Sequence, residues 1–309
     1  MKVATYIRNQ QQLVGTVVDS HIVDLAAALH ASGKGDPAQA ASVIALLAAG
    51  PSALDEANAA VAWAETQGAQ FAHPLDQVKL CAPIPCPGKL LCLAGNYASH
   101  LLEGGGTFPG KEKMIPRFFS KPCTSVIGTN DAIRVPASTG FADWELELAV
   151  VIGKSGRNLT PEEAAGHIGG YTIFNDISAR ELTFRKELPL QDGDWFFDWL
   201  VGKWLDTFGP MGPWMTTADE VSHPDNLRMQ LWYNGQLQQD ANTGQMIFSP
   251  AEAISFISQF VTLQPGDIIS TGTPAGVGHS KKLRLNPGDQ IRGEIEGLGA
   301  LANFVERLD

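Results

Sequence analysis

One segment of twelve residues, DWELELAVVIGK at 143–154, combines a charged beginning with an apolar, β-branched end. Its alternation predicts a β-strand, in which every second side chain points to the same face. Asp143, Glu145 and Glu147 then share one face, with neighbours about 6.5–7 Å apart at roughly 3.3 Å per residue. The apolar residues that follow place the strand in a core, where adjacent carboxylates repel each other unless a cation lies between them.

A second acidic position follows along the chain. The segment GYTIFND at 170–176 reads as a strand that ends in Asp176, and a helix predicted at 160–168 connects the two strands. Thr160, Pro161 and Glu163 provide the N-cap signals of that helix, and Ser249, Pro250 and Glu252 provide similar signals for a later one. Three carboxylates without a nearby Cys or His are typical of an oxygen site for Mg²⁺, Mn²⁺ or Ca²⁺. A charged strand face that simply meets solvent is the alternative, and the pattern leaves both open.

The rest of the chain divides near residue 79. Residues 3–8 and 13–18 predict a hairpin, and the Ala-rich stretches 25–31, 38–49 and 52–67 predict short helices. After a Pro-rich joint at 81–88, short apolar runs alternate with Pro and Gly, which is typical of a mostly β domain. The sequence therefore predicts a mainly β protein with some α structure, with a small accessory domain at 1–78 and a catalytic domain at 79–309.

The charge balance limits the partners. The chain has 22 Lys and Arg residues against 33 Asp and Glu residues, a formal net charge of −11. We therefore expect neither nucleic acid nor a membrane surface as a partner, because both require a basic face. No apolar run reaches about 18 residues, and the first residues lack the apolar core of a secretion signal. We accordingly predict a cytoplasmic protein.

Several motifs in a fixed order resemble the fumarylacetoacetate hydrolase family. The resemblance covers about residues 80–309 and implies a mixed β-sandwich roll preceded by a small α/β domain. The matching pieces are GNY at 95–97 followed by His100, FSKP at 119–122, ELELAVVIG at 145–153, NDISAR at 175–180, GK at 202–203 and TGTPAGVG at 271–278.

The resemblance also implies roles for individual residues. It implies a divalent cation, Mg²⁺ with Mn²⁺ or Ca²⁺ as alternatives, held by Glu145, Glu147 and Asp176. Family members bind 2-oxo or 1,3-dicarbonyl acids and commonly form homodimers. The expected substrate-binding residues are Tyr97, Arg180, Lys203 and Thr273, and the expected catalytic residues are His100, Glu103 and Lys203. Arg180 lies one turn beyond Asp176 if the chain coils there, and Glu103 orients the His100 ring if that segment is helical.

These features lead us to expect a metal-dependent hydrolase. It would cleave a C–C bond in an acylpyruvate- or fumarylpyruvate-like 1,3-dicarbonyl acid, in the breakdown of aromatic compounds. The alternatives are a decarboxylase of oxaloacetate-type 2-oxo acids, a ureidoglycolate-type lyase on the same site, or a binding protein without catalysis. Thr183 stands where many members have Gln, which leaves the substrate open. The glycines 104–106 and residues 107–114 form a candidate lid.

Other polar residues are assigned structural roles. For Lys121 two roles stay open, a contact with substrate or neutralisation of the acidic cluster. We expect His167 and His279 to be structural. Asp192, Asp194 and Asp198 are expected to be surface acids on a loop.

Overall fold

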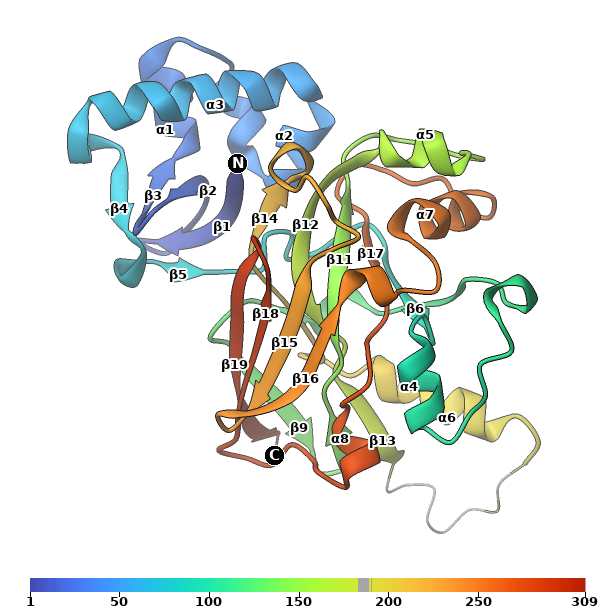
Figure 1. Cartoon of the computed structure of the whole chain (residues 1–309). Helices are drawn as coiled ribbons and strands as arrows, with labels where there is room; N and C mark the ends of the chain where they lie inside the picture. Colours follow the sequence, from blue (N-terminus) through green and yellow to red (C-terminus); the bar gives the residue numbers. More distant parts are fainter. Residues whose placement is uncertain (183–188, 190, 309) are drawn as a thin grey trace.

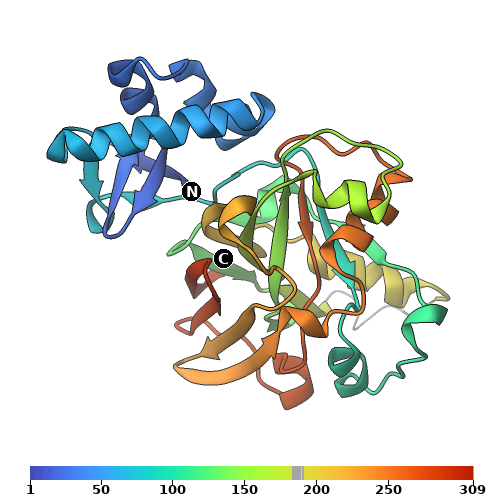
Figure 2. The same ribbon diagram turned by 45° about the horizontal axis from the view of Figure 1, so that its top comes forward.

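The chain begins with a hairpin covered by helices (Figures 1 and 2). The computed structural model describes residues 1–182, 189 and 191–308. Strands β1 and β2 pair antiparallel with Arg8 opposite Gln11, so the predicted hairpin is confirmed. The helices expected in the Ala-rich stretches are also found. The elements are β1 (Lys2–Arg8), β2 (Gln11–Val18), β3 (His21–Asp24), β4 (Ala72–Pro74), α1 (Leu25–Ser32), α2 (Val43–Ala48) and α3 (Pro51–Thr66).

The first strands continue into the main sheet of the protein. β1 pairs with β14, with Lys2 opposite Thr216, and the resulting twelve-stranded sheet runs β4-β3-β2-β1-β14-β12-β11-β17-β6-β7, with β5 on β1 and β8 on β14. The division at residue 79 is thus not a break in the sheet, and it stays a prediction. The further strands are β5 (Lys79–Leu80), β6 (Leu90–Ala94), β7 (Arg117–Ser120), β8 (Val126–Ile127), β11 (Leu146–Ile152), β12 (Ile168–Asn175), β14 (Gly209–Thr217) and β17 (Ile268–Ser270).

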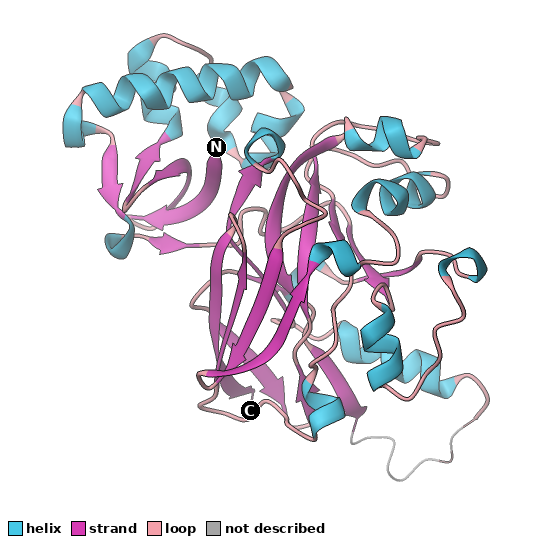
Figure 3. Cartoon of the chain, viewed as in Figure 1, coloured by secondary structure: helices cyan, strands magenta, loops and turns pink. Residues whose placement is uncertain are grey.

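A second sheet packs against the main one (Figure 3). Leu146 and Leu148 from β11 share one buried cluster with Met229, Leu231 and Ile291 from the second sheet. The strand-rich sandwich predicted from the resemblance is therefore confirmed. The second sheet has the order β16-β15-β18-β19-β9, and β10 pairs with β13 in a separate ribbon; their bounds are β9 (Ala132–Pro136), β10 (Thr139–Asp143), β13 (Ser178–Leu182), β15 (Arg228–Tyr233), β16 (Gln236–Asn242), β18 (Gln290–Ile295) and β19 (Gly299–Leu308).

Strand β11 lies between β12 and β17 and is buried along its whole length. It begins at Leu146, later than predicted, because the chain changes sheets at Trp144 and Glu145. Asp143 belongs instead to β10 and pairs with Ser178 of β13. The acidic segment therefore crosses from the ribbon into the core of the main sheet.

The helices that follow residue 79 lie at the ends and edges of the sheets (Figure 3). The predicted N-terminal caps are present, because Thr160 with Glu163 and Ser249 with Glu252 both form reciprocal capping boxes. No helix among the described residues has the length and apolar character needed to cross a membrane. The helices are α4 (Ala98–Glu103), α5 (Pro161–Ala165), α6 (Asp194–Lys203), α7 (Pro250–Ser258) and α8 (Gly278–Lys281).

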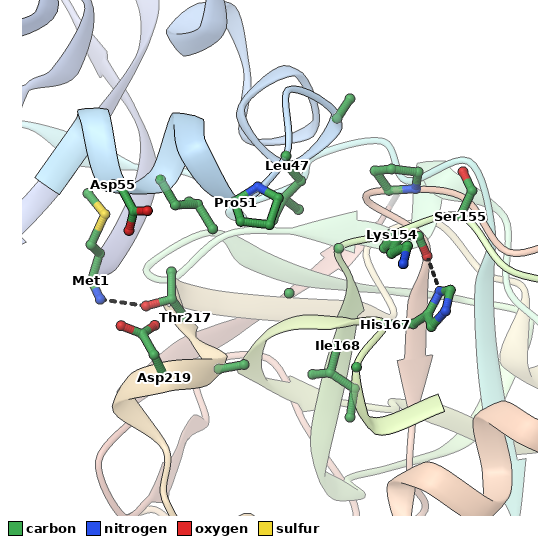
Figure 4. Close-up of a pocket in the computed structure, with 18 of the residues that line it drawn as sticks. Met1, Leu47, Pro51, Asp55, Lys154, Ser155, His167, Ile168, Thr217 and Asp219 are labelled. Carbon is green, nitrogen blue, oxygen red and sulfur yellow. Dashed lines mark hydrogen bonds between the residues drawn. The ribbon is translucent and has the colours of Figure 1, made fainter. Parts of the chain in front are cut away.

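A cavity of about 620 Å³ lies where the first helices meet the main sheet. Figure 4 shows Pro51 and Asp55 of α3 on one side, and Lys154 and His167 beyond the end of β11 on the other. The ring Nδ1 of His167 lies 2.9 Å from the carbonyl oxygen of Lys154, which accounts for this histidine structurally. The acidic residues of the central strands do not line this cavity.

Gly202 fixes the position of α6 against the ribbon. A Cβ atom at this glycine would lie 2.2 Å from the carbonyl oxygen of Ala179 on β13. We therefore expect Gly202→Ala to push the helix outward and to lower the free energy of unfolding by about 1–3 kcal/mol in urea titrations. Gly104→Ala is the matched control, because its Cβ would have no neighbour closer than 3.7 Å. Equal stability of the two variants would contradict this packing.

Candidate metal centre and active site

Three carboxylates meet at one end of the central strands. Leu146 of β11 pairs with Asn175 of β12, so Glu145, Glu147 and Asp176 come from adjacent chain segments. Each offers an oxygen within 4.8 Å of the others, and their exposed fractions are 5%, 0% and 1%. We call these three residues the acidic triad. The grouping expected from strand spacing is therefore present.

Two lysines supply positive charge to the acidic triad. The Lys203 Nζ atom lies 2.8 Å from Glu145 Oε2 and 2.6 Å from Asp176 Oδ2. The Lys121 Nζ atom lies 2.7 Å from Asp176 Oδ1, which agrees with the neutralising role, one of the two roles left open for it. In the part of the chain that the structure describes, Glu147 is the member of the triad without a lysine at hydrogen-bond distance.

Glu147 carries an unused acceptor. Its Oε2 atom accepts hydrogen bonds from the Ser270 hydroxyl at 2.5 Å and from the Gly272 N–H at 2.8 Å. Its Oε1 atom is buried and has no hydrogen-bond partner among the described residues, although a buried carboxylate oxygen normally has one. An all-oxygen donor set with a free acceptor fits a hard divalent cation. The residues present therefore fit the metal that the sequence predicted.

The surroundings move the pKa values of the two glutamates in opposite directions. Burial raises the pKa of Glu147 well above its ordinary value, and the nearby Asp176 and Glu145 carboxylates raise it further. Burial also acts to raise the pKa of Glu145, but Lys203 and Arg180 outweigh it and hold that pKa well below its ordinary value. The cations in the structure thus favour the charged form of Glu145 and leave Glu147 poorly compensated.

Helix α4 carries a histidine–carboxylate pair. His100 and Glu103 lie three residues apart on this helix, and His100 Nδ1 is 2.9 Å from Glu103 Oε1. Glu103 Oε2 accepts hydrogen bonds from the Gly276 N–H and the Ser280 hydroxyl, each at 2.9 Å. Burial acts to raise the pKa of Glu103, but these hydrogen bonds lower it overall. The carboxylate is thereby fixed, and the Nε2 atom is the ring nitrogen left for other chemistry.

One cavity of about 550 Å³ brings this pair together with Glu145 of the acidic triad. His100 and Glu103 line it along with Glu145, Lys203 and Thr273. Aromatic side chains close one side, where the rings of Phe119 and Trp199 meet edge to face at 4.8 Å. The lining of the cavity also includes Arg117, Arg180, His279 and Ser280.

Asp143 connects Arg180 on strand β13 with the start of helix α8. Its buried carboxylate accepts hydrogen bonds from Arg180 Nε at 3.1 Å, from the Gly278 N–H at 2.6 Å and from the His279 N–H at 3.1 Å. Arg180 also bonds to Glu145, while Ser280, beside His279, holds Glu103. The sequence placed Asp143 with the acidic face but did not reveal this link, which depends on contacts 37 and 135 residues away.

Some expected site residues lie differently from the prediction. The Tyr97 side chain is fully buried, and its hydroxyl lies 3.3 Å from Met229 Sδ, so the structure does not bring it to the described lining of the cavity. Arg180 lies on strand β13 and not on a coil. His279, expected to be structural, lines the cavity. Asp194 and Asp198 lie on helix α6 and not on a loop. Thr183 lies outside the described residues.

Comparison with known proteins now decides the family. The profile described as Fumarylacetoacetate (FAA) hydrolase C-terminal matches residues 89–306. The chain belongs to this family. In a Sphingobium species, the structure of maleylpyruvate hydrolase in complex with manganese (II) ion and pyruvate superimposes with a TM-score of 0.77 at 31% identity, covering 100% of both chains. A member of this family with the same fold therefore binds a divalent metal and a small acid.

Other members of the family are closer in sequence. The mitochondrial oxaloacetate tautomerase of Xenopus laevis is 41% identical over 272 residues, which is 87% of this chain and 80% of that protein. The mitochondrial oxaloacetate tautomerase of Rattus norvegicus is 38% identical over 273 residues, which is 87% of this chain and 81% of that protein.

These relatives correct two predictions. The expected C–C bond hydrolase is contradicted, because relatives at about 40% identity are named for a reaction of oxaloacetate and not for hydrolysis. The predicted role in aromatic breakdown depended on that hydrolase activity, so it loses its support. The alternative reading, an enzyme of oxaloacetate-type acids, agrees better with them. The predicted cytoplasmic location is also contradicted, because both relatives are named as mitochondrial.

Metal binding by the acidic triad should stabilise the protein. A ligand that binds only the folded state adds about 2.7 kcal/mol to the free energy of unfolding when its free concentration is a hundred times its dissociation constant. We expect Mn²⁺ to raise the Tm of the wild-type protein and to leave the Tm of Glu147→Gln unchanged in thermal melts. Glu162→Gln, at an exposed position on α5, should behave as the wild type does. A full metal-induced shift in Glu147→Gln would place the metal elsewhere.

The Asp143 link should matter for stability. Asp143→Asn keeps the size of the side chain but removes the charge opposite the partly buried Arg180. We expect the free energy of unfolding to fall by about 3 kcal/mol, since breaking a buried ion pair leaves one charge uncompensated. Asp240→Asn is the control, because it breaks an exposed pair with Arg228 and should cause no measurable change in urea titrations. Equal effects would mean that Asp143 does not hold Arg180.

Proposed function

We propose that the protein interconverts the keto and enol forms of oxaloacetate or a closely similar 2-oxo acid. The observation that carries this proposal is the cavity lined both by the His100–Glu103 pair and by Glu145, a member of the acidic triad. Tautomerisation requires one group that moves a proton and another that stabilises an enolate. The names of the Xenopus and rat relatives support oxaloacetate as the substrate.

The acidic triad would hold the cation in this proposal. A divalent cation bound there acts as a Lewis acid and lowers the energy of the enolate form of a 2-oxo acid. We propose Mg²⁺ as the ion, with Mn²⁺ or Ca²⁺ as alternatives. Two of the chain's own residues complete the site in this proposal. The Lys203 ammonium faces the developing oxyanion, and the neutral Thr273 hydroxyl, buried beside Gln239, faces the substrate's carboxylate end.

His100 would move the proton. Glu103 Oε1 fixes the ring through Nδ1, so Nε2 is the atom that takes the proton from C3 of the keto acid and delivers it to the enolate oxygen. Glu103 cannot rotate away, because Gly276 and Ser280 hold its other oxygen. Glu103 is therefore the orienting group and His100 the acid–base group.

The assembly is part of the proposal as well. We propose a homodimer whose binding partners are small anionic 2-oxo acids, without nucleic acid or membrane partners. The acidic composition supports this, since a formal net charge of −11 disfavours polyanions.

The direct test is proton exchange at C3 of oxaloacetate in D₂O, followed by ¹H NMR with Mg²⁺ present. We expect the wild type to accelerate exchange, and His100→Ala to reduce the rate by a factor of about 10²–10⁴, the usual contribution of a general acid–base group. Glu103→Gln should lie between the two, because it keeps the ring in place but loses the carboxylate charge.

The same spectra provide the control and the contrary results. His100→Ala should keep the Mn²⁺-induced rise in Tm, which shows that the metal site is intact. Undiminished exchange in His100→Ala would contradict its role. Release of pyruvate faster than exchange would make the protein a decarboxylase of oxaloacetate and overturn the tautomerase assignment.

A further inference from the structure

We propose that Arg117 binds the second carboxylate of a dicarboxylic 2-oxo acid and thereby makes the site select diacids over monoacids. This inference rests on the proposed function, because it takes the 2-oxo acid end of the substrate to lie at the acidic triad. It adds a specificity-determining residue at the opposite end of the same cavity.

The charges along the cavity single out Arg117. Among the described residues, the Lys and Arg side chains that line the cavity are Arg117, Arg180 and Lys203. Arg180 is held by Asp143 and Glu145, and Lys203 by Glu145 and Asp176. Arg117 has no ion pair in the part of the chain that the structure describes. Its charge is therefore the one available for a substrate anion without first displacing a carboxylate.

The backbone places Arg117 at the outer end of the cavity. Strand β7 pairs with β6, with Arg117 opposite Ala94, and Ala94 lines the same cavity. Arg117 and Phe119 are two residues apart on β7, so their side chains share a face. The Lys203 Nζ atom lies 5.3 Å from the centre of the Phe119 ring. Lys121, which follows β7, contacts Asp176, so the chain runs from Arg117 past Phe119 toward the acidic triad.

The spacing suits a short diacid. Residues two apart on a strand are separated by about 6.5–7 Å, and a flexible Arg side chain can bridge part of that distance. The end carbons of a four-carbon acid lie about 4 Å apart at a bond length of roughly 1.5 Å. In the proposed orientation, the 2-oxo acid end of oxaloacetate meets Lys203. The C4 carboxylate then points toward the side of the cavity that holds Phe119 and Arg117.

The carboxylates near the cavity also make a further cation favourable for binding a diacid. The described lining of the cavity includes the carboxylates of Glu103 and Glu145, and Glu147 and Asp176 lie just behind it. A doubly charged substrate meets more repulsion there than a singly charged one. A guanidinium at the outer end offers two parallel N–H donors to the distal carboxylate and offsets this repulsion. A methyl group in the same position gains nothing from Arg117.

The test compares two stable acids that differ only at C4. Malate carries a carboxylate at C4 and 2-hydroxybutanoate carries a methyl group. The binding of either acid can be measured without turnover. Binding to the Mn²⁺-loaded protein is measured by calorimetry. We expect Arg117→Ala to weaken malate binding roughly ten- to a hundredfold, the loss of one charge-assisted hydrogen-bonded pair, and to change 2-hydroxybutanoate binding by less than about twofold.

Two further variants sharpen the result. Arg117→Lys keeps the charge without the planar fork and should recover part of the malate affinity. Lys34→Ala removes one exposed positive charge from the N-terminal segment, and it should leave the preference for malate unchanged. An equal loss for both acids in Arg117→Ala, or no loss for either, overturns the inference.

The outcome is separable from the proposed function. If the wild type binds malate with an Arg117-dependent preference but does not accelerate C3 exchange in oxaloacetate, the tautomerase assignment fails and the diacid selectivity stands. If exchange is fast and the preference does not depend on Arg117, the function stands and this inference fails.

Discussion

Repulsion among three buried carboxylates is the constraint on which this structure depends. Glu145, Glu147 and Asp176 lie within 4.8 Å of one another at the end of the most buried strands. Such a cluster is tolerable only with positive charge beside it. Lys203 and Lys121 supply that charge in the structure, and both are themselves buried. The neighbouring elements, α6 and the segment after β7, serve to deliver these two ammonium groups.

The same constraint explains why the centre of the site could be predicted from sequence. Acidic residues alternate along a strand that turns fully apolar, which favours a buried cluster over a solvated face, and the helix predicted between this strand and the one ending in Asp176 makes the two strands candidate neighbours. Local signals were sufficient here: the caps at Thr160 and Ser249 begin helices where expected. The helical spacing of His100 and Glu103 is likewise found, with the hydrogen bond that it implies.

Other features depend on contacts that no local pattern encodes. Asp143 continues the alternation of Glu145 and Glu147, but the chain changes sheets at Trp144, so its carboxylate meets Arg180 and the start of α8 instead. Tyr97 stands in a family motif, but its ring is in the core. The reaction itself was misjudged, because the same pair and triad serve hydrolysis and proton transfer equally well. Closer relatives, and not the motifs, separated these chemistries.

The proposed chemistry requires a divalent cation in the space among the three carboxylates. Anomalous diffraction from a crystal soaked in Mn²⁺ tests it most directly. We predict one strong peak within bonding distance of Glu145, Glu147 and Asp176, at about 2.0–2.6 Å from their oxygens, with the Lys203 ammonium displaced from between Glu145 and Asp176. A crystal in which that ammonium stays in place and no peak appears among the three carboxylates would contradict it.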